Sequence, residues 1–146
     1  MADQERFVHA VHIVARALGR ISRERARAVD VTPQQAETLQ LIFERGAVST
    51  SSLAEQLGID PSTASRNLSG LERSGLISRK KGTDDARQTD VRLTPRGKRV
   101  AESVAAGSST SFTAVLDQLP RGDRQRVTDA LELLARALDS NGDAQR

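Results

Sequence analysis

The sequence predicts a mainly α-helical chain with one small β-hairpin. Apolar residues near both ends recur at spacings of three and four, which is typical of amphipathic helices. Between the two ends, short apolar segments are bounded by capping residues, proline and glycine, as short helices are. After Gly75 the pattern changes to two strand-like segments around a polar, charged tip. With 146 residues, the chain has the length of a single domain.

The first expected element is a helix with a continuous apolar face. Phe7, Val11, Val14, Leu18 and Ile21 follow one another at spacings of 4, 3, 4 and 3 residues, which places them on one side of the helix. The chain has three Phe and neither Tyr nor Trp. Because so few aromatic residues can build a thick core, we expect this face to pack against another helix, in the same chain or in a second copy.

The second helix has a defined start and end. Residues 32–35 (Thr-Pro-Gln-Gln) form a capping box with proline at the first helical position. Leu39, Ile42 and Phe43 then lie on one face, and Gly46 ends the helix.

Two further helices follow with a tight turn between them. Ser49 can cap the first, which ends at Gly58, and Asp60 and Pro61 begin the second, which ends at Gly75. Gly58 suits the turn because glycine adopts left-handed backbone conformations without a steric penalty. This order predicts a helix-turn-helix.

The hairpin comes directly after the helix-turn-helix. Residues 76–80 and 90–94 have the pattern of strands, and residues 81–89 between them are polar and charged. The connection is too long for a tight turn, so we interpret the hairpin as the wing of a winged helix-turn-helix.

A long helix is expected after the wing. Thr94 and Pro95 begin it, and it passes through residues 107–111 (Gly-Ser-Ser-Thr-Ser), where helix propensity is low. We expect a kink or a frayed turn at this point. The alternative is a true loop between two separate helices.

The C-terminal helix carries a second apolar stripe. It follows a start near Pro120, and its stripe repeats the spacing of 4, 3 and 4 at Val127, Leu131, Leu134 and Leu138. The two stripes either pack on each other within one chain or form a subunit interface. We favour the interface, with Phe7, Val11, Val14 and Leu18 contributing from the first helix.

Positive charge is concentrated in the middle of the chain. The whole chain has a net charge of +3, whereas residues 61–99 hold ten basic and four acidic residues, a net charge of +6. A basic centre between less basic flanks is typical of nucleic-acid binding. Of the 22 cations 19 are Arg, which suits bidentate contacts with phosphate and guanine. A coding preference could explain the share of Arg but not the clustering.

The sequence gives little support to catalysis or to a cofactor. It has no Cys, which excludes disulfides, thiolate metal sites and thiol-based redox sensing. His9 and His12 are the only histidines, and no third ligand nearby completes a metal site. The N-terminus lacks a signal peptide and no long apolar stretch is present, so we expect a cytoplasmic protein without a membrane partner and without a cofactor.

The order of these elements resembles the MarR family of bacterial winged-helix transcription regulators. Residues 51–79, SSLAEQLGIDPSTASRNLSGLERSGLISR, resemble the helix-turn-helix of that family with its Gly-Leu-Ile strand entry. Residues 84–100, DDARQTDVRLTPRGKRV, resemble its wing, with an Asp-x-Arg tip at Asp85 and Arg87. A Leu-Thr-x-x-Gly exit follows at Leu93, Thr94 and Gly97. The layout agrees along nearly the whole chain, and the residue-level resemblance extends from Thr32 to Arg99.

We expect the second helix of the helix-turn-helix to read DNA. In such a helix the N-terminal residues face base edges in the major groove, where Arg66 has the length to reach guanine. Short hydroxyl side chains permit close approach, and the helix N-terminus favours a phosphate. Simple capping is the alternative for Ser62, and a solvated arginine is the alternative for Arg66. The candidate residues are Ser62, Thr63, Ser65, Arg66, Ser69 and Arg73, of which the last two are expected to meet the DNA backbone.

The resemblance implies that Arg87 enters the minor groove, where a narrow A·T-rich groove concentrates negative potential. Asp85 is then expected to orient Arg87 without touching DNA, because a carboxylate near phosphates is repelled. The remaining wing cations are expected to contact phosphates, and the alternative for some of them is a solvated surface charge. These candidates are Arg79, Lys80, Lys81 and Arg92, with Arg96 and Lys98 directly after the second strand.

Together these features predict one domain over residues 1–146. Residues 32–99 form a winged helix-turn-helix lobe that binds DNA, and residues 1–31 and 100–140 form a helical dimerisation region. We expect a homodimeric regulator of transcription, and not an enzyme, that binds a pseudo-palindromic site in double-stranded DNA. The resemblance also implies a pocket between the dimerisation helices and the DNA-binding lobe, where a small-molecule effector weakens DNA binding. No Tyr or Trp is present to stack on an aromatic ligand. The alternatives are an architectural DNA binder with little sequence preference and a winged-helix protein-interaction module.

Overall fold

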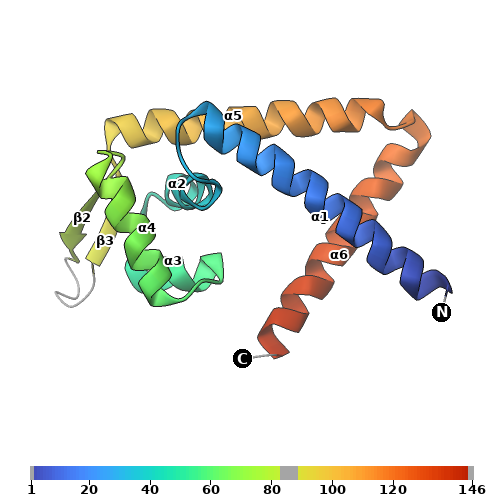
Figure 1. Ribbon diagram of the computed structural model, residues 1–146, viewed down its shortest axis with the longest axis horizontal. Helices are drawn as coiled ribbons and strands as arrows, with labels where there is room; N and C mark the ends of the chain where they lie inside the picture. Colours follow the sequence, from blue (N-terminus) through green and yellow to red (C-terminus); the bar gives the residue numbers. More distant parts are fainter. Residues whose placement is uncertain (1, 83–88, 145–146) are drawn as a thin grey trace. The chain divides into compact units, whose positions relative to one another are not determined.

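The computed structural model describes residues 2–82 and 89–144, and it is mainly helical with one small sheet (Figure 1). The sequence therefore predicted the fold class correctly. The elements run in the order α1 (Ala2–Ala28), α2 (Pro33–Arg45), β1 (Ala47–Ser49), α3 (Thr50–Leu57), α4 (Pro61–Arg73), β2 (Ile77–Lys81), β3 (Thr89–Leu93), α5 (Pro95–Gln118), a 3₁₀ turn (Arg121–Asp123) and α6 (Arg124–Ala144).

The helix boundaries follow the capping residues expected from the sequence. Thr32 and Gln35 form the reciprocal capping box of α2, with both backbone-to-side-chain hydrogen bonds present. Ser49 caps α3 by accepting from the backbone N–H of Ser52 at 3.2 Å. Gly58 ends α3 in the left-handed conformation with φ +64°, so the chain turns tightly into α4.

The sheet contains one strand more than the sequence predicted. Its order is β1-β3-β2 with both pairs antiparallel, and Val91 lies opposite Val48 on one side and Arg79 on the other. The hairpin of β2 and β3 was expected to within one residue at its described ends. β1 has only three residues, which is too short to show a strand periodicity, and it forms because β3 offers it backbone partners.

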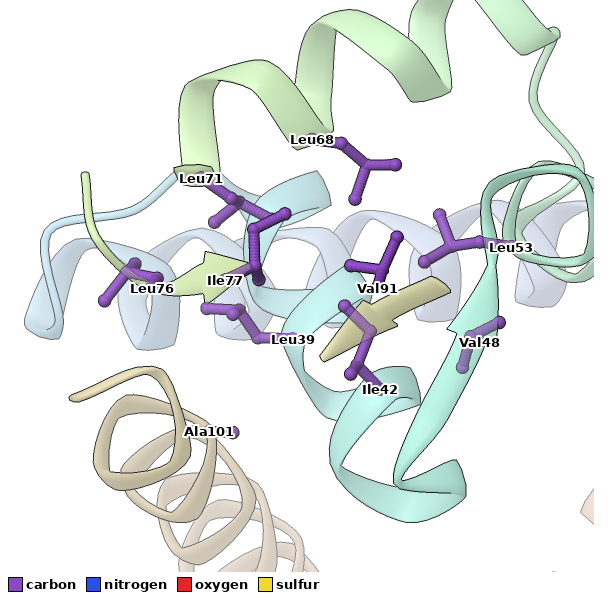
Figure 2. Close-up of a cluster of buried hydrophobic side chains, with 10 residues drawn as sticks. All are labelled: Leu39, Ile42, Val48, Leu53, Leu68, Leu71, Leu76, Ile77, Val91 and Ala101. Carbon is purple, nitrogen blue, oxygen red and sulfur yellow. The ribbon is translucent and has the colours of Figure 1, made fainter. Parts of the chain in front are cut away.

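The main core lies between the helix-turn-helix and the sheet. Leu68 and Leu71 of α4 face Leu39 and Ile42 of α2, with Val91 of β3 between them (Figure 2). Val48, Leu53, Leu76, Ile77 and Ala101 complete this cluster. Since α4 is held by its buried leucines, its opposite face is left exposed to solvent.

α5 runs without a break through residues 107–111, so the expectation of a loop or a frayed turn there was wrong. The buried residues of this helix precede that segment, and Val104 packs with Ala26 and Ala36 in a second small cluster. A Cβ built at Gly107 would lie 3.8 Å from the Cγ of Arg25, so α1 lies beside this part of α5. Packing along the helix outweighs the low propensity of the Gly-Ser-Ser-Thr-Ser sequence.

The chain comprises two compact units, Met1–Ser108 and Ser109–Arg146. The first holds the helix-turn-helix, the sheet and the core, and the second holds the end of α5, the 3₁₀ turn and α6. Among the described helices, none is long and apolar enough to cross a membrane.

Candidate nucleic-acid interface

The N-terminus of α4 is occupied by a side chain of the protein itself. The carboxylate of Asp60 accepts a hydrogen bond from the hydroxyl of Ser62, and it accepts two more from the backbone N–H and the hydroxyl of Thr63 at 2.9 and 2.5 Å. These hydrogen bonds, led by the one from Ser62, hold the pKa of Asp60 well below its ordinary value. The first turn of α4 is therefore rigidly capped, and the negative charge of Asp60 stands where we expected a phosphate.

The expected recognition residues lie on the exposed side of α4. Ser65, Arg66 and Arg73 are exposed, whereas Thr63 and Ser69 are half-buried. The guanidinium of Arg66 donates a long hydrogen bond of 3.3 Å to the hydroxyl of Thr63. Arg66 is thus an exposed cation near the start of α4, beside the capped first turn.

Arg79 differs from the other expected wing cations because it is held within the fold. It is half-buried, its Nε atom donates to the carboxylate of Glu72, and its Nη2 atom donates to the hydroxyl of Ser69 at 3.3 Å. Both partners lie on α4, so Arg79 joins β2 to α4. The sequence does not indicate these contacts, since Glu72 and Ser69 lie seven and ten residues earlier in the chain.

The other described wing cations are exposed. Lys80 and Lys81 lie near the end of β2, and Arg92 lies on β3 opposite Ser78. The predicted minor-groove residue Arg87 and its orienting residue Asp85 lie outside the described residues. The wing strands alone therefore present three exposed cations beside α4, which contacts β2.

The base of the wing is closely attached to the end of α4. Thr94 caps α5 by accepting from the backbone N–H of Gly97 at 3.0 Å, and its hydroxyl donates to the carbonyl of Gly75 at 2.6 Å. Arg96, which we had expected to contact phosphate, donates to the carbonyl of Ser74 at 2.9 Å. These contacts connect the start of α5 to the turn after α4, so the hairpin has a fixed origin.

A cavity of about 510 Å³ lies in the first unit and is lined by residues of α1, α2, α3 and α5. The resemblance implied a pocket between the outer helices and the DNA-binding lobe, but the residues that line it were not predicted. Its lining includes the side chain of Arg25, whose Nε and Nη1 atoms are buried without a hydrogen-bond partner. Arg25 lies four residues after Ile21, at the next position of the apolar stripe. A cation at an apolar position is the feature of the sequence that could have indicated a functional role for Arg25. The cavity is lined by Ser22, Arg25, Pro33, Ala36, Glu37, Gln40, Leu41, Glu44, Gln56, Leu57, Val104 and Ser108.

The two histidines give no sign of a metal site. His9 and His12 are exposed on α1. Within residues 2–82 and 89–144, no group of three or more His, Cys, Asp or Glu side chains is arranged to hold a metal ion.

Comparison with known proteins finds similarity to one family. The model of the MarR family matches residues 31–89, which run from the residue before the cap of α2 through the helix-turn-helix and β2 to the first residue of β3. This segment is therefore similar to the MarR family. Among its relatives, the HTH-type transcriptional regulator YfiV of Bacillus subtilis is 28 % identical over 112 residues, which cover 77 % of this chain and 70 % of that protein.

A second relative and a solved structure show the same similarity. The transcriptional repressor MdtR of B. subtilis is 29 % identical over 111 residues, covering 76 % of this chain and 72 % of that protein. The crystal structure of FabT from Streptococcus pneumoniae in complex with DNA has the same fold, with a TM-score of 0.86, 18 % identity and coverage of 94 % and 98 % of the two chains. The fold of this chain is thus the winged helix of MarR-family proteins, and YfiV and MdtR are named as transcriptional regulators.

Proposed function

We propose that this protein is a homodimeric repressor of the MarR family that binds a pseudo-palindromic operator in double-stranded DNA. The observation that carries the proposal is the exposed Arg66 near the rigidly capped start of α4, a helix that contacts β2 of the wing, whose strands carry further exposed cations. A recognition helix reads base edges with its N-terminal residues, and an Arg in that position forms bidentate contacts with guanine. In the proposed complex Ser65 lies close to the bases, and Arg73 contacts the DNA backbone.

The capped first turn limits what Ser62 and Thr63 can do in this proposal. Their hydroxyl groups donate to Asp60, so only their oxygen lone pairs remain to accept from bases. Phosphate contacts then come from the exposed cations Lys80, Lys81 and Arg92. Ser69 and Arg79 act by joining β2 to α4, through the hydrogen bond between them.

The wing tip contributes the minor-groove contact in this proposal. Arg87 enters a narrow groove, and Asp85 orients it from two residues away in the chain. This assignment is supported by the Asp-x-Arg sequence of the tip and by the similarity of residues 31–89 to the MarR family.

Exposed apolar stripes on the outer helices support a homodimer. On α1 the exposed fractions of Phe7, Val14 and Leu18 are 57, 45 and 44 %. On α6 the exposed fractions of Leu131 and Leu138 are 53 and 61 %. Helices with such stripes are stable when the stripes are covered, and two copies of one chain cover them symmetrically. The half-buried Val11, Val127 and Leu134 complete the proposed interface.

The cavity beside Arg25 supports control by a small-molecule effector. The half-buried Arg25 has two buried guanidinium nitrogens, Nε and Nη1, without a hydrogen-bond partner, and these favour an anionic group because burying an unpaired donor is costly. The cavity volume of about 510 Å³ is within the range of small-molecule sites. Glu37 and Glu44 also line it, so the effector would combine an anionic group with hydrogen-bond donors. Its binding would favour a form of the dimer in which the separation of the two recognition helices does not fit the two half-sites of the operator.

DNA selection followed by affinity measurement tests the proposed function. Fragments of the source genome that the protein retains give the operator, and a short palindromic footprint is the expected result. Arg66→Ala and Arg87→Ala should each weaken operator binding, and Arg87→Ala should also lower the slope of log affinity against log salt concentration by about one. Arg121→Ala, which removes an exposed cation from the second unit, is the matched control and should bind as the wild type does. Wild-type affinity in the double variant Arg66→Ala/Arg87→Ala would overturn the proposal.

A further inference from the structure

We propose that Asn67 and Thr38 form a positioning pair that fixes the rotation of α4 about its own axis and so aims Arg66 at the DNA. This inference rests on the proposed function of α4 as the recognition helix. It assigns to Asn67 a role in sequence discrimination that requires no contact with DNA.

The pair is a direct side-chain contact between two helices. The amide Nδ2 of Asn67 on α4 donates to Oγ1 of Thr38 on α2 at 2.6 Å, and that hydroxyl donates in turn to the carbonyl of Gln34 at 2.8 Å. Thr38 is fully buried, and it is the one fully buried polar residue in the described part of the chain. Its hydroxyl both accepts and donates, so the chain of two hydrogen bonds links α4 to the backbone of α2.

This hydrogen bond restricts α4 in a way that its apolar contacts do not. Leu68 and Leu71 bury α4 in the core, but apolar packing has little directional preference, whereas a hydrogen bond weakens steeply when its angle changes. Successive residues of an α-helix are about 100° apart around its axis. Asn67 directly follows Arg66. Anchoring the side chain of Asn67 therefore determines the direction in which the side chain of Arg66 leaves the helix.

A close approach of α4 to α2, one turn after Asn67, also supports a fixed rotation of α4. A Cβ built at Gly70 would lie 3.1 Å from the Nε2 atom of Gln35, so α4 passes near the first turn of α2 at this point. Gln35 is itself held by the capping box with Thr32. The contacts of α4 on this side are thus made with side chains whose positions are already fixed.

Direct reading of a base by Asn67 is the competing explanation. An asparagine reads adenine by donating from its amide nitrogen and accepting at its oxygen together. Here Asn67 is half-buried and its amide nitrogen donates to Thr38. Its influence on DNA is therefore exerted through the orientation of α4.

The test measures affinity for the operator and for a non-cognate duplex of equal length, by fluorescence anisotropy at one salt concentration. Thr38→Val removes the hydroxyl at nearly constant volume, Asn67→Ala removes the donor, and Thr38→Ser keeps the hydroxyl. We expect the first two variants to lose about tenfold in operator affinity while their affinity for the non-cognate duplex stays unchanged. Thr38→Ser should behave as the wild type does. The double variant Thr38→Val/Asn67→Ala should be no weaker than the single variants, because both remove one interaction.

Circular dichroism confirms that each variant is folded before its affinity is measured, and if Thr38→Val does not fold, Asn67→Ala and Thr38→Ser carry the test. Equal losses for operator and non-cognate DNA indicate a merely structural role and overturn the inference. Unchanged operator affinity in Asn67→Ala overturns it as well. Arg66→Ala separates this result from the proposed function: if Arg66→Ala weakens operator binding while Asn67→Ala does not, only the positioning role fails. Wild-type operator affinity in Arg66→Ala contradicts the proposed function itself.

Discussion

Gly97, at the base of the wing, cannot be replaced by a larger residue without a shift of the backbone around it. A Cβ built at Gly97 would lie 1.8 Å from the carbonyl oxygen of Leu76, far inside van der Waals contact with the backbone. The backbone N–H of Gly97 also donates to the hydroxyl oxygen of Thr94. The first turn of α5 therefore packs directly against the backbone at the start of the wing. The glycine of the Leu-Thr-x-x-Gly sequence is therefore required by close approach and not by its backbone conformation.

Gly97→Ala should lower the free energy of unfolding by about 2 kcal/mol or more, because either α5 or the strand entry at Leu76 must shift. Urea denaturation measures this change. Gly122→Ala is the matched control, since a Cβ at Gly122 meets nothing within 4 Å, and it should leave stability nearly unchanged. Equal stability of the two variants would contradict the close contact.

Because of Asp60, the free energy of unfolding should decrease as the pH becomes acidic. Its folded-state pKa lies below the ordinary value of 3.8, so the ionised form stabilises the fold. This contribution is fully present at neutral pH and is lost as the pH falls below about 4 towards the lowered pKa. Asparagine keeps the capping oxygen but cannot ionise, so the stability difference between the wild type and Asp60→Asn should shrink on acidification. Urea denaturation between pH 7 and pH 3 measures it, and a pH-independent difference would count against the assignment.

At the scale of elements, α5 shows how packing overrides a local preference. Residues 107–111 have low helix propensity, yet the helix continues through them. A Cβ at Gly107 would meet the Cγ and Cδ atoms of Arg25 at 3.8 and 3.9 Å, which are ordinary contact distances. Glycine is therefore tolerated at this position without being needed there.

Gly107→Ala should raise the free energy of unfolding by about 0.5–1 kcal/mol, because alanine loses less conformational entropy in a helix. Thermal and urea denaturation both detect a change of this size. Gly46→Ala provides the contrast, since φ at Gly46 is +82° and a side chain is strained there, so it should destabilise the protein. A destabilised Gly107→Ala variant would show that the space beside Arg25 is tighter than the distances indicate.

At the scale of the whole molecule, the apolar stripes on α1 and α6 leave a single chain with exposed apolar surface. The main core holds ten buried residues, all between α2 and the first turns of α5. No residue of α6 is fully buried in the part whose side chains the structure describes. This distribution fits an oligomer in which the outer helices contribute a second, shared core.

Leu131→Glu should convert the proposed dimer into a monomer, because a carboxylate would be buried without a partner in an apolar interface. Analytical ultracentrifugation measures the change in mass. Glu132→Ala alters the neighbouring exposed position on α6 and should leave the dimer intact. Operator affinity should fall when the dimer is lost, since one recognition helix reads only half of the site. A dimeric Leu131→Glu variant would exclude Leu131 from the interface.

The sequence by itself determined the elements whose signals are local. Thr32, Ser49 and Asp60 lie within three residues of the atoms that they cap, so their roles could be predicted from spacing alone. The basic character of the wing and the exposed position of Arg66 were likewise predictable from residue type and helical position. These features depend on neighbours in the chain, which the sequence displays directly.

Only the tertiary structure decided the features that join distant segments. Asn67 lies 29 residues from its partner Thr38, and β1 exists because β3 lies beside it. From its charge alone, Arg79 was expected to contact phosphate, yet in the fold it bonds to Glu72 and Ser69. The physical reason is the same in each case: a hydrogen bond or ion pair needs both groups at one place, and folding brings such groups together regardless of their separation in the sequence.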